Sequence, residues 1–275
     1  MLTSPAPGGV LAGPSVTFTW TSATGAGNQG YWLFLGTTGV GSKNLYDSGQ
    51  QTTTSATFSN LPTNGETIYA RVYTSYNGTL VYNDYTYRAA SQAVLTTPTP
   101  GSSLTGSSAT FTWTAASGSG NQGYWLYLGT TGVGSKDLYD SGQQTATSAT
   151  FNKLPTDGAT IYARLYTRYN GTLVYNDYRY TAWMQPPTLT SPTPGSTFTG
   201  PSATFTWTAE AGSQGYWLFL GTTGAGSRNL YDSGQQAATS ATFNSLPTNG
   251  ETIYARVYTR YNGVLVYNDY TYEAK

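Results

Sequence analysis

The strongest constraint on the fold is that one long segment occurs three times in this chain of 275 residues. The phrase F-T-W-T recurs at intervals of 93 and 94 residues, with its tryptophan at Trp20, Trp113 and Trp207. The phrase that begins Y-W-L recurs at intervals of 93 and 92 residues, starting at Tyr31, Tyr124 and Tyr216. Self-similarity over this length predicts three tandem copies of one domain.

Short, proline-rich segments join the copies. They read A-S-Q-A-V-L-T-T-P-T-P-G and A-W-M-Q-P-P-T-L-T-S-P-T-P-G. Proline restricts the backbone, so we expect semi-rigid joints and three domains in line as a rod. The predicted domains cover residues 1–92, 93–186 and 187–275.

Within a copy, strand patterns alternate with turn signals. In residues 15–21, Val16, Phe18 and Trp20 alternate with Ser and Thr, which indicates a half-buried strand. Further strands are expected at residues 30–36, 45–46, 55–58, 67–76 and 79–87, the first of these a central strand covered on both faces. Asn77-Gly78 is a strong hairpin signal, and no helical spacing of apolar residues persists. Seven short strands in each copy predict an all-β fold of three tandem immunoglobulin-like β-sandwiches.

The order of these features resembles a fibronectin type III domain. That family has a tryptophan in its second strand, as Trp20 here, and a Leu-Pro turn before a tyrosine-containing strand, as Leu61-Pro62 before Tyr69 here. The W-L-x-L-G-T and Y-N-D-Y-T-Y phrases are similar to modules of bacterial secreted and surface proteins, which implies an extracellular or cell-surface location. The spacing from Leu61 to Tyr69 is two residues longer than in the family, so Ile68 is expected to point inward instead.

Composition excludes several classes of function. The chain has neither Cys nor His, so thiol nucleophiles, disulfides and the usual zinc sites are ruled out. Lys+Arg and Asp+Glu number 12 each, and only 9% of residues are charged. We therefore expect no nucleic-acid partner. No apolar run is long enough for a membrane span, no signal peptide is visible, and no cofactor is predicted.

Three motifs that resemble functional sites have simpler interpretations. Residues 36–43, G-T-T-G-V-G-S-K, lack the Lys directly after the last Gly that a phosphate-binding loop needs, and are interpreted as a turn. Paired carboxylates hydrolyse glycosides, but Asp84 has no acidic partner at fixed spacing and Glu66 is Ala159 in the second copy. A calcium site at Asp84 would lack the expected acidic loop. No catalytic residue and no metal ligand is predicted, so we expect a protein that is not an enzyme.

One face of one sheet is expected to carry aromatic side chains together with Arg and Asp. If Ile68 points inward, the alternate residues of neighbouring strands point outward. In the first copy these are Trp32, Phe34, Tyr69, Arg71, Tyr73, Tyr82 and Asp84. Their counterparts are Trp125, Tyr127, Tyr162, Arg164 and Tyr166, then Trp217, Phe219, Tyr254, Arg256 and Tyr258.

Three interpretations of this face stay open. It packs against other copies of the chain or other surface proteins, because interfaces favour Trp, Tyr and Arg. Alternatively, it stacks on the sugar rings of a polysaccharide, with repetition adding avidity. In the third interpretation Arg71 and Asp84 only pair across a tyrosine-rich sheet. The sequence therefore predicts a structural or adhesive protein that can assemble into filaments or surface layers. The alternative is an array of carbohydrate-binding modules.

Overall fold

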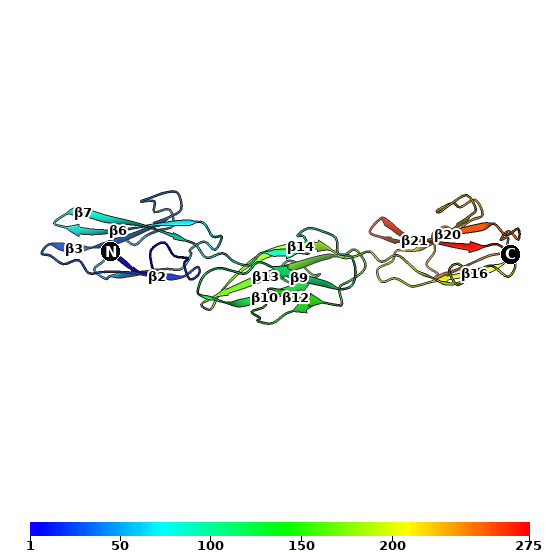
Figure 1. Ribbon diagram of the computed structural model, residues 1–275, viewed down its shortest axis with the longest axis horizontal. Helices are drawn as coiled ribbons and strands as arrows, with labels where there is room; N and C mark the ends of the chain where they lie inside the picture. Colours follow the sequence, from blue (N-terminus) through cyan, green and yellow to red (C-terminus); the bar gives the residue numbers. More distant parts are fainter. The chain divides into compact units, whose positions relative to one another are not determined.

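The fold contains strands and turns but no helix. The computed structural model describes residues 1–275, and no helix long and apolar enough to cross a membrane is present. The first repeat has seven strands: β1 (Leu2–Ser4), β2 (Val16–Trp20), β3 (Asn28–Gly36), β4 (Tyr46–Asp47), β5 (Ser55–Phe58), β6 (Thr67–Tyr76) and β7 (Thr79–Arg88). β6 and β7 form the long hairpin drawn in cyan in Figure 1.

The second and third repeats have the same succession of strands. In the second these are β8 (Leu95–Thr97), β9 (Ala109–Trp113), β10 (Asn121–Gly129), β11 (Tyr139–Asp140), β12 (Ser148–Phe151), β13 (Thr160–Tyr169) and β14 (Thr172–Thr181). In the third these are β15 (Leu189–Ser191), β16 (Ala203–Trp207), β17 (Tyr216–Gly221), β18 (Tyr231–Asp232), β19 (Ser240–Phe243), β20 (Thr252–Tyr261) and β21 (Val264–Glu273).

The strands of each repeat form two sheets. In the first repeat the order is β1-β2-β5 in one sheet and β4-β3-β6-β7 in the other. The other two repeats have the same pair, β8-β9-β12 with β11-β10-β13-β14 and β15-β16-β19 with β18-β17-β20-β21. This division of seven strands is that of an immunoglobulin-like sandwich. The predicted fold class of three tandem β-sandwiches is confirmed.

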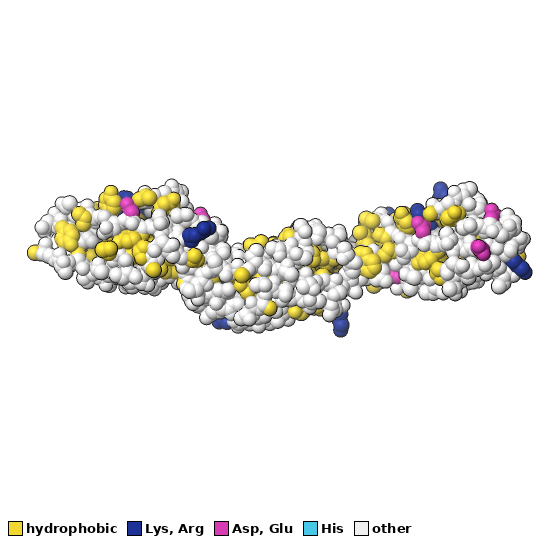
Figure 2. Space-filling view, in the orientation of Figure 1, with side chains coloured by type: hydrophobic (Ala, Val, Ile, Leu, Met, Phe, Trp, Pro, Cys, Tyr) yellow, Lys and Arg dark blue, Asp and Glu magenta, His cyan; other side chains and the backbone are white.

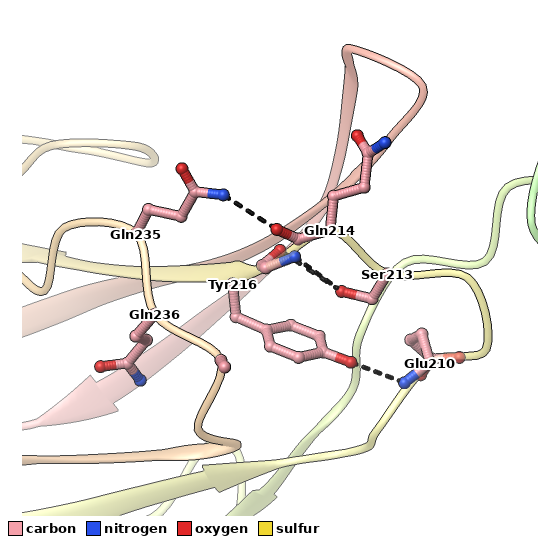
Figure 3. Close-up of a pocket in the computed structure, with 8 residues that line it drawn as sticks. Glu210, Ser213, Gln214, Tyr216, Gln235 and Gln236 are labelled. Carbon is pink, nitrogen blue, oxygen red and sulfur yellow. Dashed lines mark hydrogen bonds between the residues drawn. The ribbon is translucent and has the colours of Figure 1, made fainter.

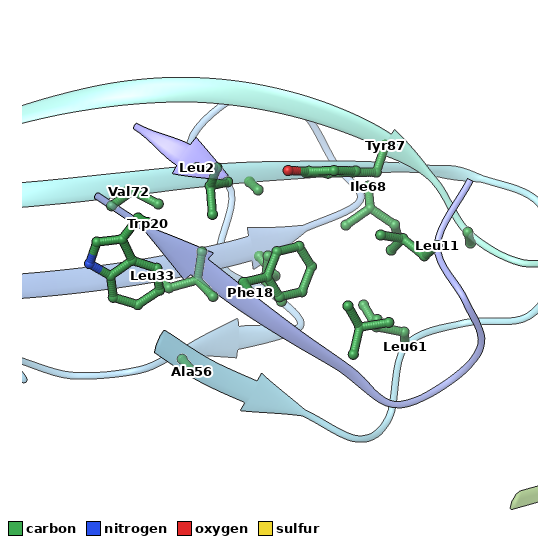
Figure 4. Close-up of a cluster of buried hydrophobic side chains, with 14 of the residues drawn as sticks. Leu2, Leu11, Phe18, Trp20, Leu33, Ala56, Leu61, Ile68, Val72 and Tyr87 are labelled. Carbon is green, nitrogen blue, oxygen red and sulfur yellow. The ribbon is translucent and has the colours of Figure 1, made fainter. Parts of the chain in front are cut away.

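The core of the first repeat lies between its two sheets. Phe18 of β2 contacts Tyr87 of β7 edge to face, with ring centroids 5.6 Å apart, and both side chains are buried. Leu33 of β3 and Ile68 of β6 complete the centre of this cluster, which Figure 4 shows. Ile68 therefore points inward, as predicted. The third repeat has an equivalent cluster in which Phe205 contacts Tyr272.

The β6–β7 turn follows the chemistry of its two residues. Asn77 and Gly78 have φ angles of 47° and 81°. A two-residue hairpin turn of type I′ needs positive φ at both positions, which Asn and Gly tolerate best. The predicted hairpin is confirmed. β1, for which the sequence indicated no range, is three residues long and pairs with β2.

The strand at residues 30–36 is central in its sheet, as expected, but it is not covered on both faces. β3 lies between β4 and β6, so it is central in its sheet. Its inward residues Leu33 and Leu35 are buried, whereas Trp32 and Phe34 on the other side are half-buried. A strand covered on both faces would bury all four side chains, so its outer face has only the cover that its neighbours on the same sheet provide.

The proposed domain boundaries stay a prediction. The strands of the three repeats fall within residues 1–92, 93–186 and 187–275. By its internal contacts, however, the chain divides into two compact units. One unit comprises residues 1–100, 110–150 and 162–179, and the other comprises residues 101–109, 151–161 and 180–275. The second repeat thus contributes to both units.

Tyrosines of β7 connect the end of the first repeat to its beginning. The Tyr85 hydroxyl accepts a hydrogen bond from the Leu2 amide at 2.9 Å, and the Tyr87 hydroxyl donates one to the Pro5 carbonyl at 3.1 Å. Burial raises the pKa of Tyr87 to about 12, from an ordinary value of 10.0. The neutral phenol is therefore part of the folded state.

This pKa shift predicts alkaline destabilisation of the first repeat. Above pH 10 the unfolded chain releases the Tyr87 proton while the folded repeat keeps it, so the free energy of unfolding falls as pH rises towards about 12. Denaturant unfolding at several pH values should show a smaller decrease in a Tyr87→Phe variant, which has no proton to release. Equal pH dependence in the two proteins would contradict this assignment.

Candidate functional site

Strand register brings the predicted outward residues together. Trp32 of β3 lies opposite Tyr73 of β6, which lies opposite Tyr82 of β7. In the next row Phe34 lies opposite Arg71, and Arg71 opposite Asp84. We call the outward surface formed by Trp32, Phe34, Tyr69, Arg71, Tyr73, Tyr82 and Asp84 the aromatic face, and use the same name for its counterparts in the other repeats.

The other two repeats carry the same arrangement. In the second, Trp125 pairs with Tyr166, Tyr127 with Arg164, and Gly129 with Tyr162. In the third, Trp217 pairs with Tyr258, Phe219 with Arg256, and Gly221 with Tyr254. The predicted juxtaposition therefore exists three times.

The guanidinium group of Arg71 contacts three neighbouring side chains. Its Nε and Nη2 donate to the two carboxylate oxygens of Asp84 at 2.6 and 2.8 Å, and its Nη1 donates to the Tyr73 hydroxyl at 3.3 Å. Its guanidinium carbon lies 3.9 Å from the ring centroid of Tyr82. The hydrogen bond to Asp84, followed by that to Tyr73, raises the pKa of Arg71. The guanidinium and carboxylate are thus paired with each other.

The aromatic rings form a continuous row across the sheet. Phe34 contacts Tyr73 edge to face at 5.1 Å, and Tyr73 contacts Tyr82 at 5.5 Å. Edge-to-face geometry suits the ring quadrupoles and stabilises such pairs by about 0.5–1.5 kcal/mol. At the other end of the row, Lys43 lies over Phe34 and donates to Asp47 at 3.0 Å. The residues 36–43 are a connection between β3 and β4, as predicted.

Exposed apolar residues on β7 extend this surface beyond the residues that the sequence predicted. Leu80 and Val81 are about half exposed and directly precede Tyr82, which is 52% exposed. The corresponding exposed residues in the other repeats are Leu173, Tyr175, Leu265 and Tyr267, and the third repeat adds the exposed Val264 where the first has Thr79. β7 is the edge strand of its sheet, and proteins usually protect such edges with charge. The uncharged T-L-V-Y phrase after the Asn-Gly turn was the signal that could have revealed this surface.

Charged side chains are sparse over the visible surface of the molecule. Figure 2 shows isolated Lys, Arg, Asp and Glu side chains among apolar and uncharged polar atoms. No group of three or more Asp and Glu side chains lies close enough together to hold a metal ion. Low charge weakens the electrostatic repulsion that normally keeps soluble proteins apart.

A polar hollow of about 480 Å³ lies at the start of β17 in the third repeat (Figure 3). The Tyr216 hydroxyl accepts a hydrogen bond from the Glu210 amide at 2.7 Å, and Gln235 donates to the Gln214 carbonyl at 2.8 Å. Burial raises the pKa of the Glu210 carboxyl group, while the Thr208 hydroxyl donates to it. The hollow contains this single acid among amides, so it lacks the acid pair of a glycosidase.

Comparison with known proteins yields structural likeness without sequence relatives. No protein-family model matches the chain, and no curated protein is similar to it. Among solved structures, the chicken CNTN1 FN1–FN3 domains share 14% identity at a TM-score of 0.33, covering 98% of this chain and 99% of that one. Three N-terminal domains of the bacteriophage RB49 Highly Immunogenic Outer Capsid protein share 10% sequence identity at a TM-score of 0.36, covering 97% of this chain and 95% of that one. Titin domains I67–I69 share 9% sequence identity at a TM-score of 0.36, covering 98% of this chain and 95% of that one.

The Arg71–Asp84 pair predicts that lysine cannot replace arginine here. Lysine lacks the planar fork that binds both carboxylate oxygens and stacks on Tyr82. We expect Arg71→Lys to lower the free energy of unfolding of the first repeat by about 1 kcal/mol. Denaturant unfolding of Arg71→Lys, Asp84→Asn and the double variant measures the coupling. If the two effects simply add, the pair contributes nothing through their interaction.

The strand order described above thus defines three tandem immunoglobulin-like β-sandwiches, each with an aromatic face.

Proposed function

We propose that this chain is a non-enzymatic structural or adhesive repeat protein of the cell surface or extracellular space, and that its aromatic faces bind protein surfaces, copies of the same chain included. The observation that carries the proposal is the combination of exposed apolar groups with charges that are already paired. It occurs three times along one chain, so weak contacts at each face add through avidity.

The state of the charged groups favours a protein partner. A buried interface penalises any charge that loses water without gaining a partner. Arg71 and Asp84 already satisfy each other through two hydrogen bonds, and Arg164–Asp177 does the same in the second repeat. The face can therefore lose its water at little electrostatic cost. The exposed side chains of Leu80 and Tyr82 supply the apolar area that such contacts bury.

The same geometry disfavours stacking on sugar rings. A sugar platform needs a free ring face and unpaired polar groups beside it. The guanidinium of Arg71 lies against the ring of Tyr82, and the equivalent distances to Tyr175 and Tyr267 are 3.9 and 3.8 Å. Because the charged groups beside these rings are already paired with each other, they are not available to bind sugar hydroxyls, and polysaccharide binding is the less favoured alternative.

The surroundings of the Asp and Glu side chains support the proposal that the chain is not an enzyme. Asp84 is paired with Arg71, Asp47 is paired with Lys43, and Glu210 lies in a hollow without a second acid. With no His and no Cys in the sequence, these acids have no partner for acid–base or nucleophilic chemistry.

Replacing the exposed tyrosines of the three faces tests the proposal. The triple variant Tyr82→Ser, Tyr175→Ser and Tyr267→Ser removes a large aromatic contact from each face. If these tyrosines lie at the centre of the contact, binding should weaken by about 2 kcal/mol or more. Light scattering over a concentration series and retention on a sensor coated with the same chain measure the loss.

A matched control alters the opposite sheet of each repeat. The exposed Thr57, Thr150 and Thr242 become Ser, which keeps their hydroxyl groups, and this variant should behave as wild type. If the tyrosine variant also assembles and adheres as wild type, the aromatic face is only a stabilised sheet and the proposal is wrong. Tyrosine-dependent binding to a panel of polysaccharides, without self-association, would favour the carbohydrate alternative.

A further inference from the structure

The three repeats differ in how one end of the sandwich is covered. We call this the hairpin end: the last tyrosine of the long strand before the Asn-Gly turn, with the loop that precedes the third strand. The tyrosine is Tyr76, Tyr169 or Tyr261 in the three repeats. Tyr169 and Tyr261 are 1% and 0% exposed, whereas Tyr76 is only half-buried. Nearly identical strands thus have different surroundings.

Residues that precede the second repeat, together with its own loop, cover its hairpin end. The single Tyr169 hydroxyl hydrogen is shared between the carbonyl of Ser91, at 2.7 Å, and that of Ser117 in the same repeat, at 2.9 Å. The Gly120 amide donates to the carbonyl of Ala12 at 3.0 Å. Ala12 belongs to residues 11–14 of the first repeat, L-A-G-P, which we call its loop end. A loop end of one repeat therefore contacts the hairpin end of the next.

This contact requires glycine on both sides. A Cβ atom on Gly13 would lie 2.5 Å from the Cβ of Tyr169, and one on Gly118 would lie 2.8 Å from the carbonyl oxygen of Leu11. Both distances are shorter than van der Waals contact. Any side chain at Gly13 would therefore push the loop end away from Tyr169.

The hairpin end of the third repeat is covered in another way. Its loop is two residues shorter, and the Tyr261 hydroxyl donates to the carbonyl of Gln185 at 2.9 Å. The glycine of the second repeat's loop end, Gly106, has no atom within 4 Å of a Cβ built on it, so it does not make the close contact that Gly13 makes. Met184 packs instead against Gly158, 2.9 Å from a Cβ at that position.

The hairpin end of the first repeat and the loop end of the third repeat match the two partners of the first kind of contact. The loop end of the third repeat reads F-T-G-P at residues 198–201, like L-A-G-P at 11–14, whereas the second repeat has L-T-G-S. The hairpin loop of the first repeat reads T-G-A-G-N at residues 24–28, like S-G-S-G-N at 117–121. These are the two partners that meet between the first and second repeats.

We propose that the hairpin end of the first repeat binds the loop end of the third repeat of a second copy of this chain. Gly200 then takes the place of Gly13, against Tyr76, and the carbonyl of Thr199 accepts a hydrogen bond from the Gly27 amide. Gly200 meets no atom within 4 Å of a Cβ position in this chain, so the surface is open to a partner. A contact between unlike ends propagates from copy to copy unless the rotation closes a ring.

Docking needs a small adjustment of the first hairpin loop. Gly27 has a φ of 91°, whereas its counterpart Gly120 is not left-handed. Glycine occupies both regions at similar energy, so the loop can adopt the covered conformation. The bond from the Ala93 amide to Thr167 comes from the covalent joint and has no counterpart in this docking. The association is therefore weaker than the joint within the chain.

The substitution Gly200→Leu tests the contact without disturbing the fold, because its side chain enters open space. Sedimentation equilibrium of the full chain, from about 10 µM to about 1 mM, should show a rising average mass for wild type. In Gly200→Leu the association constant should fall at least tenfold. Gly106→Leu is the matched control, since its position is equally open but lies at the loop end that does not make this contact.

Each outcome is decisive. The proposal stands if Gly200→Leu reduces association and Gly106→Leu does not. It is wrong if wild type stays monomeric throughout, or if Gly200→Leu associates as wild type, or if both leucine variants lose association equally. The tyrosine triple variant separates this contact from the aromatic face: if it abolishes association that Gly200→Leu leaves intact, the aromatic face carries the self-association and the ends do not.

Discussion

The pairing register of β6 is the constraint on which the rest of each sandwich depends. β6 has β3 on one side and β7 on the other, and its residues alternate between the core side and the outer side from Thr67 to Tyr73. Ile68 enters the core on one side, while Arg71 lies between Phe34 and Asp84 on the other. A shift of one residue would expose Ile68 and separate Arg71 from Asp84. Core packing and the aromatic face therefore specify the same register.

Because core packing and the aromatic face specify the same register, a sheet with few charges keeps a defined outer surface. The paired guanidinium and carboxylate cross-link β6 and β7, and the rings of Phe34, Tyr73 and Tyr82 pack beside them. Cross-strand contacts of this kind stabilise a sheet whose outer face has no second layer. The outer surface is consequently ordered and poor in unpaired polar groups, which are the properties of a surface suited to protein contacts.

The aromatic faces and the ends of the sandwiches have different physical characters. The faces combine apolar side chains with paired charges, so the contacts that we propose for them depend on buried area. The contact between the first two repeats depends on close approach of backbone, with Gly13 and Gly118 leaving room for it and Tyr169 providing the hydroxyl. The two proposed contacts therefore depend on different residues, and one can change without altering the other.

The sequence by itself determined the local structure and the side of the sheet on which each residue lies. Asn77 and Gly78 adopt the expected turn, and Ile68 points inward, because φ preferences and the two-residue period of a strand are local properties. The pairing of Arg71 with Asp84 was one of several possibilities, since register depends on neighbouring strands. Only the tertiary structure decided what covers a given side chain. Tyr76 and Tyr169 occupy the same place in nearly identical strands, yet only Tyr169 is buried, because its cover comes from residues far away in the chain.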